Sequence, residues 1–301
     1  MGASVCVVGS LNADLTFRTT RRPSPGETLT AHGFTVGPGG KGANQAVMAA
    51  RLGTSVVMIG RVGADSFGQQ LLQMLREQGV GTAHVGIDAT LSTGVAGILV
   101  EDAAQNCILV AAGANGSLTP EFVRAAGDSI RGAGVLLCQL EVPIEATLEA
   151  FRLARAANVR TVLTPAPVRE LPEELLRLTD ICVLNETEAD SIAGTANGPV
   201  AAAAALRQRG PAEVIVTLGE RGCFVSGPSG DATFAAPRVN AVDTTGAGDA
   251  FVGALAAGLA AGIALIRAIP HAIAAAALSV TRAGAQASYP SRAEVEAFLS
   301  R

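Results

Sequence analysis

The chain has 301 residues, which is enough for one domain with a substantial core. Its residues are 49% hydrophobic and only 16% charged, which argues against an intrinsically disordered protein. A net charge of −4 and an aromatic content of 3% argue against a nucleic-acid partner, because they supply neither a basic face nor stacking side chains.

The cysteines indicate the cellular compartment. They number five, lie far apart and mostly sit in apolar runs, so we expect buried free thiols in a reducing cytoplasm. No export or anchoring signal is visible in the sequence, and we expect no membrane partner. The apolar stretch 250–266 is short and rich in Ala and Gly, which indicates a buried helix.

Short apolar runs alternate with amphipathic stretches along the first two thirds of the chain. The runs predict strands at residues 5–8, 55–59, 134–140, 160–163, 180–184 and 213–218. The amphipathic stretches predict helices at residues 43–52, 66–78, 143–157 and 199–209. This alternation predicts a doubly wound α/β fold, with a mostly parallel sheet covered by helices on both faces.

Two stretches interrupt this rhythm, at about residues 11–36 and 92–112. In the second, residues 94–100 and 106–111 flank a polar turn at 101–105 and predict a hairpin. We expect both to form a small β lid within a single domain that covers residues 1–301, although ordinary edge strands are an alternative. The last third predicts long Ala-rich helices at 247–262 and 267–281 and a final helix at 292–299.

A Gly-rich turn leads into the first of these late helices. Free N–H groups at a helix N-terminus can hold an anion, so Gly246, Ala247 and Gly248 are candidates for an anion hole. Asp249 follows at once and is a candidate general base for phosphoryl transfer. The alternative is that Asp249 only caps the helix.

A second Gly-rich turn, at residues 37–45, formally matches the dinucleotide-binding pattern and gives an NADP-dependent oxidoreductase as an alternative function. Lys41 is the only lysine of the chain, and it is followed by Gly42, so the turn is not a Walker phosphate loop. Asn44 lies three residues further on, and we expect both side chains to face a polyol from the same side of a helix.

Polar residues follow three of the predicted strands. Asn12 and Asp14 alternate onto one face, Glu141 ends a buried strand, and Asn185 and Glu188 begin a helix. These positions suit ligand groups at the carboxyl edge of an α/β sheet, and the last pair also suits Mg²⁺-bound water and phosphate. The alternatives are a turn former, an exposed loop carboxylate and an ordinary N-cap.

Taken together, these segments resemble the family of carbohydrate and nucleoside kinases that includes ribokinase, fructokinase and adenosine kinase. The resemblance covers nearly the whole chain, through residues 9–14, 25–28, 39–46, 112–115, 139–141, 165–167, 185–189, 217–219 and 243–249. It implies a sugar kinase that uses ATP, Mg²⁺ and K⁺ to phosphorylate the primary hydroxyl of D-ribose, giving ribose 5-phosphate and ADP, and that forms a homodimer through the lid. The alternatives are 2-deoxyribose, fructose or a nucleoside as acceptor, or a non-catalytic sensor on the same fold.

The resemblance also implies roles for individual residues. It implies sugar contacts from Asn12, Asp14, Gly40, Lys41, Gly42, Ala43, Asn44 and Glu141, with Asp249 as the base and Gly246, Ala247 and Gly248 as the anion hole. It implies nucleotide contacts from Asn185, Glu188, Thr217, Leu218, Gly219, Glu220, Arg221, Gly222, Gly248 and Asp249. It implies a K⁺ site at Asp243, Thr245, Ser279, Arg282, Gly284 and Ser288, several of them through backbone carbonyls.

Two positions depart from the family pattern. Ile273 stands where Asn or His commonly lies beside adenine, with His271 two positions earlier, and Thr164 stands where Asn often precedes Pro-Ala-Pro. The residue that contacts adenine is therefore not predicted.

Overall fold

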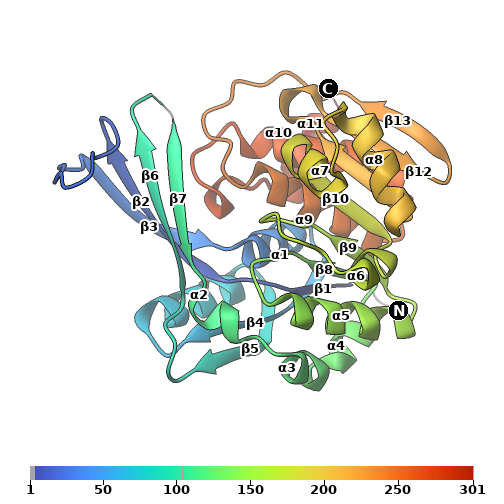
Figure 1. Cartoon of the computed structure of the whole chain (residues 1–301), viewed down its shortest axis with the longest axis horizontal. Coiled ribbons are helices and arrows are strands. Elements are labelled where there is room, and N and C mark those ends of the chain that lie inside the picture. Colours follow the sequence, from blue (N-terminus) through green and yellow to red (C-terminus); the bar gives the residue numbers. More distant parts are fainter. Residues whose placement is uncertain (1–3, 104, 301) are drawn as a thin grey trace.

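The computed structural model describes residues 4–103 and 105–300, which form a large and a small sheet (Figure 1). The large sheet has nine strands within the described residues, in the order β13-β12-β11-β10-β9-β8-β1-β4-β5. Seven of them are parallel, namely β1 (Ser4–Val8), β4 (Ser55–Gly63), β5 (Val80–Asp88), β8 (Val135–Cys138), β9 (Arg160–Leu163), β10 (Ile181–Asn185) and β11 (Glu213–Thr217). The antiparallel strands β12 (Cys223–Gly227) and β13 (Gly230–Phe234) complete one edge.

The parallel strands are apolar along their length because helices cover both faces of the sheet. In β1, Val5 and Val7 belong to one core cluster, and Cys6 and Val8 belong to the other. One face carries α1 (Lys41–Arg51), α2 (Ser66–Glu77), α9 (Ala247–Ala260), α10 (Leu265–Ser279) and α11 (Arg292–Leu299). The opposite face carries α3 (Pro120–Ala125), α4 (Gly127–Arg131), α5 (Ile144–Ala156), α6 (Glu173–Arg177), α7 (Glu186–Ala193) and α8 (Gly198–Arg209). The predicted doubly wound α/β fold is confirmed.

The small sheet has the order β3-β2-β6-β7 and projects from the body at the left of Figure 1. It consists of β2 (Asn12–Thr19), β3 (Gly33–Gly39), β6 (Gly94–Glu101) and β7 (Asn106–Ala111). β6 and β7 pair antiparallel, as the predicted hairpin requires, so the alternative of edge strands in the main sheet is wrong. Ala104, which belongs to the turn predicted at 101–105, lies outside the described residues.

Residues 37–45, which formally match the dinucleotide-binding pattern, do not form the structure that this motif requires. Gly37 and Gly39 lie inside β3 and pair with β2, whereas that motif requires a tight turn directly after a buried parallel strand. The structural basis for the oxidoreductase alternative is therefore absent, and that alternative is wrong.

The cysteines and the apolar helices complete the comparison with the sequence. Cys6, Cys138, Cys182 and Cys223 are buried free thiols, as expected, but Cys107 is exposed because both faces of β7 are open to solvent. The apolar stretch at 250–266 contains most of α9, which is buried in the core. In the part of the chain that the structure describes, α9 and the other helices are not long and apolar enough to span a membrane.

Candidate active site

The candidate site lies at the carboxyl edge of the parallel strands, where ligands bind in open α/β sheets. β1 lies between β4 and β8, so the chain adds strands first on one side of β1 and then on the other. The segments that follow β1, β8 and β9 and the last residues of β10 and β11 all meet at this edge. The N-termini of α1 and α9 also point to it, because both helices begin after Gly-rich turns there (Figure 1).

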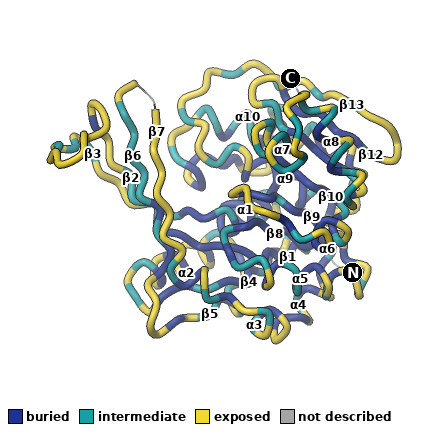
Figure 2. The backbone as a smooth tube through the Cα atoms, viewed as in Figure 1, coloured by how far each residue is buried: buried dark blue, intermediate teal, exposed yellow. Residues whose placement is uncertain are grey.

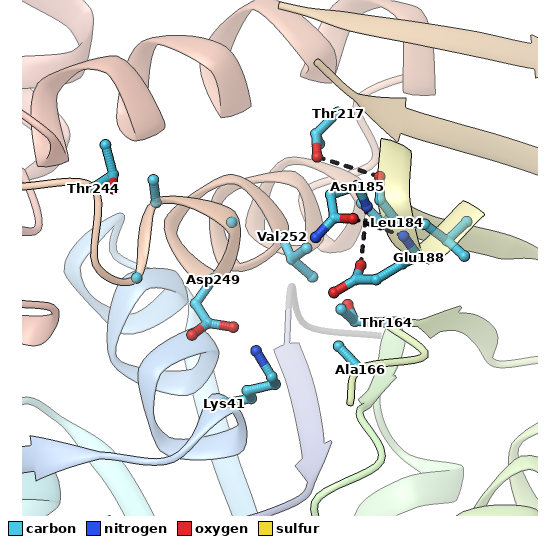
Figure 3. Close-up of a pocket in the computed structure, with 14 residues that line it drawn as sticks. Lys41, Thr164, Ala166, Leu184, Asn185, Glu188, Thr217, Thr244, Asp249 and Val252 are labelled. Carbon is cyan, nitrogen blue, oxygen red and sulfur yellow. Dashed lines mark hydrogen bonds between the residues drawn. The ribbon is translucent and has the colours of Figure 1, made fainter. Parts of the chain in front are cut away.

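A cleft of ≈ 220 Å³ opens at this edge (Figure 3). Its walls come from α1, from the ends of β9, β10 and β11, and from the turn before α9. The lining residues are Lys41, Thr164, Ala166, Val183, Leu184, Asn185, Glu188, Thr217, Thr244, Gly246, Ala247, Gly248, Asp249 and Val252. The cleft thus brings together the predicted base, the anion-hole residues, several of the nucleotide residues and Lys41. The other predicted sugar residues do not line it, namely Asn12, Asp14, Gly40, Gly42, Ala43, Asn44 and Glu141.

Gly246 shapes the turn before α9. Its backbone is left-handed, with φ 75°, and an added Cβ would lie 2.8 Å from the Tyr289 hydroxyl and 2.9 Å from Ala285 Cβ. The Tyr289 hydroxyl donates to the Gly246 carbonyl over 3.1 Å. Glycine is therefore required on both conformational and steric grounds. The N–H of Ala247 donates to the Thr244 carbonyl over 3.2 Å. The positive N-terminus of α9 is therefore presented by the backbone N–H groups of the residues after Ala247.

Asp249 lies in the first turn of α9 and is only 8% exposed. Its side chain does not cap the helix, so that alternative is wrong. Instead, Asn44 Nδ2 donates to Oδ2 over 3.0 Å and Gln45 Nε2 donates to Oδ1 over 2.9 Å. The carboxylate is thus held by side chains of α1 at the floor of the cleft.

Lys41 is the first residue of α1, and its ammonium points toward the Asp249 carboxylate (Figure 3). Attraction to Asp249 raises the pKa of Lys41, against the opposing effect of burial, and Glu141 and Glu188 raise it further. Lys41 therefore places a firmly protonated ammonium between the base and the far side of the cleft. This arrangement can neutralise the negative charge of a phosphoryl group while that group is being transferred.

Asn12 and Asp14 lie on the same face of β2, as predicted from their spacing. Asn12 Oδ1 accepts a hydrogen bond from Asn115 Nδ2 over 2.7 Å, which fixes the orientation of its amide. The Asp14 carboxyl occupies the space beside Gly39, where a Cβ would lie 2.0 Å from Oδ1. Burial first, then repulsion from Glu141 and Asp249, raises the pKa of Asp14 to about 7.

The turn before α1 is packed tightly against the end of β1. Gly40 has φ 86°, and a Cβ on Gly42 would lie 2.6 Å from the Ser10 N atom. The N–H groups of Gly42 and Ala43 donate to Ser10, over 3.3 Å and 2.9 Å. These two N–H groups therefore hold the start of α1 against the residues that follow β1.

Glu141 also supports the start of α1. Its Oε2 accepts hydrogen bonds from the Ser10 hydroxyl over 2.5 Å and from the Lys41 N–H over 3.0 Å. The alternative of an exposed loop carboxylate is therefore wrong. A carboxylate at a helix N-terminus is electrostatically favourable, so Glu141 positions Lys41 as well as adding charge to the site.

Of the residues predicted to bind nucleotide, Gly248 and Asp249 lie in the first turn of α9, and the others lie at or just after the ends of β10 and β11. Asn185 and Glu188 form a reciprocal capping box, with bonds of 2.8 Å and 2.9 Å, and Glu188 also lines the cleft (Figure 3). The N-cap role is confirmed. Thr217 lines the cleft and donates to the Leu184 carbonyl over 3.2 Å. The turn that follows flanks the cleft without lining it and contains Leu218, Gly219, Glu220, Arg221 and Gly222.

The predicted K⁺ residues come from two loops that lie side by side. The Asp243 carboxylate accepts from the N–H of Thr245 and from that of Gly284, each over 2.9 Å. The hydroxyls of Ser279 and Ser288 are buried, and they donate to the carbonyls of Ala276 and Ala285. The Arg282 guanidinium pairs with Glu294, so Arg282 has only its carbonyl to offer a cation. Carbonyl and hydroxyl oxygens are donors that suit a monovalent cation.

The two departures from the family pattern have distinct environments. Ile273 is buried in the core against α9, and His271 is exposed on α10. Thr164 follows β9, and its buried Oγ1 has no hydrogen-bond partner among the described residues.

Several residues of the site were not predicted from the sequence. Gln45, Gln139 and Gln286 are buried amides that connect to Asp249 directly or through a neighbour, and Asn115 orients Asn12. Gln45 and Gln139 stand beside the motif residues, but no local pattern indicates that they meet.

Comparison with known proteins places this geometry in context. Residues 3–292 match the pfkB family of carbohydrate kinases. The chain is 39% identical to the ribokinase of Haemophilus influenzae, over 99% of both chains. It is 38% identical to the deoxyribokinase of Salmonella typhi, over 98% of both. The structure of Arabidopsis thaliana ribokinase complexed with ribose and ATP superposes over the full length of both chains with a TM-score of 0.94 and 32% identity.

Proposed function

The chain belongs to the pfkB family of carbohydrate kinases, and from this premise we propose that it transfers the γ-phosphoryl group of ATP to the primary hydroxyl of D-ribose, giving ribose 5-phosphate and ADP. The observation that carries the proposal is the position of Asp249, buried at the N-terminus of α9 with the Lys41 ammonium pointing toward it (Figure 3). The ribokinase names of relatives that match over full length support ribose as the acceptor.

In the proposed reaction, Asp249 accepts the proton of the primary hydroxyl as its oxygen attacks the γ-phosphorus. The new O–P bond forms while the bond to the β-phosphate oxygen breaks, so ADP leaves and the proton remains on Asp249 until solvent removes it. The positive end of α9 and Lys41 stabilise the charge on the transferred group. Asn12, Asp14, Asn44, Glu141 and the Gly40 turn are the proposed surroundings of the sugar.

Two cations complete the proposal. Asn185 and Glu188 would hold Mg²⁺ through its water ligands, and the ion would supply charge neutralisation for the phosphates. The carbonyl and hydroxyl oxygens of the loops at 243–245 and 279–288 would hold K⁺, which would fix the turn before α9. The geometry fits both, because Glu188 faces the cleft and the Asp243 carboxylate ties the two loops together.

The small sheet is the proposed lid and dimer surface. Register and alternation put Asp14 on one face of it, and put Phe17, Phe34, Val36 and Leu109 on the other. These four are 41%, 55%, 46% and 76% exposed. We propose that the first face closes over the sugar and excludes water, while the second packs on the same sheet of a second copy. A cytoplasmic location is supported by the buried free thiols.

A second candidate acceptor is 2-deoxyribose, because the chain is also similar to a deoxyribokinase. The identity is 38% to that deoxyribokinase and 39% to the Haemophilus influenzae ribokinase. The two sugars differ by one hydroxyl, and a site built to bond that hydroxyl rejects the analogue that lacks it. ADP release should be measured with ATP, Mg²⁺ and K⁺ and with ribose, 2-deoxyribose, fructose, adenosine or no acceptor. Preference for ribose supports the proposal, preference for another acceptor replaces the substrate, and ligand binding without turnover favours a sensor.

Asp249→Asn tests the proposed base. The amide keeps the size of the side chain but cannot accept the proton, so kcat should fall by roughly 10²–10⁴-fold. Ribose binding measured by calorimetry should remain detectable, and the melting temperature shows whether the variant is folded. A folded variant that keeps most of its kcat would rule out Asp249 as the base.

A further inference from the structure

The Asp249 carboxylate is one member of a buried chain of side chains. On one side Gln45 holds Oδ1, and Gln139 Nε2 in turn donates to Gln45 Oε1 over 2.5 Å. On the other side Asn44 holds Oδ2, and Gln286 Nε2 donates to Asn44 Oδ1 over 2.9 Å. The five side chains are between 0% and 8% exposed. We call the first pair of amides the glutamine arm and the second pair the asparagine arm.

The charge of Asp249 determines the direction of every amide in both arms. A carboxylate only accepts hydrogen bonds, so Gln45 must turn its NH₂ group toward it and its carbonyl away. That carbonyl then requires a donor, and Gln139 supplies one. The consequence is visible at the end of the glutamine arm, where Gln139 Oε1 is buried without a partner among the described residues.

An orphaned buried acceptor is destabilising, because it loses its hydration without gaining a hydrogen bond, so its presence needs a compensating gain. The bond from Gln45 to the charged carboxylate is such a gain, because hydrogen bonds to ionised groups are roughly twice as strong as neutral ones. The end of the arm is also shaped for the amide, since a Cβ on Gly9 would lie 2.2 Å from Gln139 Oε1. The backbone directly after β1, at Gly9, therefore leaves room for Gln139 in the orientation that Asp249 requires.

We propose that Gln45 is a positioning residue for the reaction, which holds the plane of the Asp249 carboxylate so that a free lone pair meets the substrate hydroxyl. This inference rests on the proposed function. Gln45 bonds Asp249 and is not among the residues that line the cleft, so we expect it to contact neither substrate. Its loss should therefore lower kcat while leaving the KM values for ribose and ATP unchanged.

The asparagine arm supplies a matched comparison. Gln286 is buried to a similar degree, but it acts on Asn44, which is a proposed sugar contact as well as a partner of Asp249. Removing its amide takes away one of the two hydrogen bonds that hold the Asn44 amide in place, so the KM for ribose should rise. The two arms thus predict two different kinetic changes from the same kind of substitution.

The experiment compares Gln45→Met and Gln286→Met, which keep side-chain length but remove the amide. With ribose and ATP, we expect kcat of Gln45→Met to fall by roughly 10- to 100-fold with both KM values within about twofold of wild type. For Gln286→Met we expect the KM for ribose to rise by roughly tenfold or more. Melting temperatures measured in parallel report the stability lost by each variant.

A folded Gln45→Met variant with wild-type kcat overturns the inference. If Gln45→Met and Gln286→Met change kcat and KM in the same way, the inference is overturned too, because a purely structural role predicts no difference between the two arms. If Gln45→Met does not fold, Gln139→Met removes only the support of the Gln45 amide, and unchanged kcat there also overturns it. Wild-type protein without turnover on any acceptor would instead refute the proposed function.

Discussion

Asp14 is a partly buried acid at the proposed sugar site, and its carboxyl is repelled by two other carboxylates. Burial and the repulsion of Glu141 and Asp249 raise its pKa to about 7, from an ordinary value of 3.8. The folded protein therefore holds this proton more tightly than the unfolded chain does. The stability that Asp14 contributes is complete below about pH 4 and is lost as the pH rises through about 7.

Asp14→Asn should remove this dependence, because the amide is neutral at every pH. Relative to wild type, the free energy of unfolding of the variant should increase between pH 5 and pH 8, and reach a gain of roughly 1–3 kcal/mol at the higher pH. Urea unfolding at the two pH values measures this. Asp231→Asn, at an exposed position, is the matched control for the loss of one acidic charge. A gain that is equal at both pH values would contradict the raised pKa.

At the same scale, the sequence predicts which residues gather at the site better than it predicts how each is used. Lys41, Asn185 and Asp249 were predicted because polar groups after parallel strands, or at helix N-termini, must meet at one edge. Gln45 and Gln286 were not, because each bonds a residue far away in the chain. Gln45 donates to Asp249, 204 positions further on, and Gln286, in η3 (Gln286–Ser288), donates to Asn44, 242 positions earlier. Contacts of this kind leave no local pattern.

At the scale of elements, the two Gly-rich helix starts were predicted. The structure gives Gly42 of the first start and Gly248 of the second opposite steric surroundings. A Cβ on Gly42 would meet backbone atoms of Gly9 and Ser10 at 2.6–2.8 Å, whereas a Cβ on Gly248 would have nothing within 4 Å. Gly42 is therefore required for the packing of α1 on β1. The fold leaves space for a side chain at Gly248. We therefore attribute the glycine at this position to the phosphoryl group, which by the proposed function approaches the backbone there.

Matched alanine substitutions test this difference. Gly42→Ala should destabilise the protein by roughly 1–3 kcal/mol, because backbone must move. Gly248→Ala should stabilise it by about 0.5–1 kcal/mol, since alanine favours the helix. It should nevertheless lower kcat by roughly tenfold or more, since its methyl group displaces the phosphoryl group. Thermal unfolding and steady-state kinetics measure both. Full kcat in Gly248→Ala would separate Gly248 from the anion hole.

Two of the strands that the sequence does not predict, β5 and β13, lie at the two edges of the large sheet, whereas a third, β12, is buried inside it. β5 contains Gly81, Thr82, His84 and Gly86, which break its apolar pattern although it pairs along β4. β13 is a largely exposed edge strand, where no burial selects apolar residues. Strand prediction from apolar runs thus succeeds for the central parallel strands, which helices cover on both faces, and fails at both edges of the sheet and for the short antiparallel strand β12.

At the scale of the whole molecule, the small sheet exposes apolar side chains that the chain itself does not cover. β7 is exposed along its whole length, in contrast to the buried strands of the large sheet (Figure 2). The rings of Phe17 and Phe34 pair across β2 and β3 with centroids 4.8 Å apart, on the face opposite Asp14. An apolar face of this kind on a projecting sheet is suited to pairing with the same face of a second copy, because each copy then buries the exposed apolar surface of the other.

Leu109→Glu tests this pairing, since Leu109 is 76% exposed and lies on the face proposed for the second copy. Wild-type protein should sediment with the molar mass of two chains, and the variant with that of one, because a carboxylate buried in an apolar interface loses its hydration. Val200→Glu, at a 56% exposed position on α8, should remain dimeric. If the dimer supports closure of the lid, the Leu109→Glu monomer should also show a raised KM for ribose. A dimeric Leu109→Glu, or a monomeric wild type, would show that this face has another role.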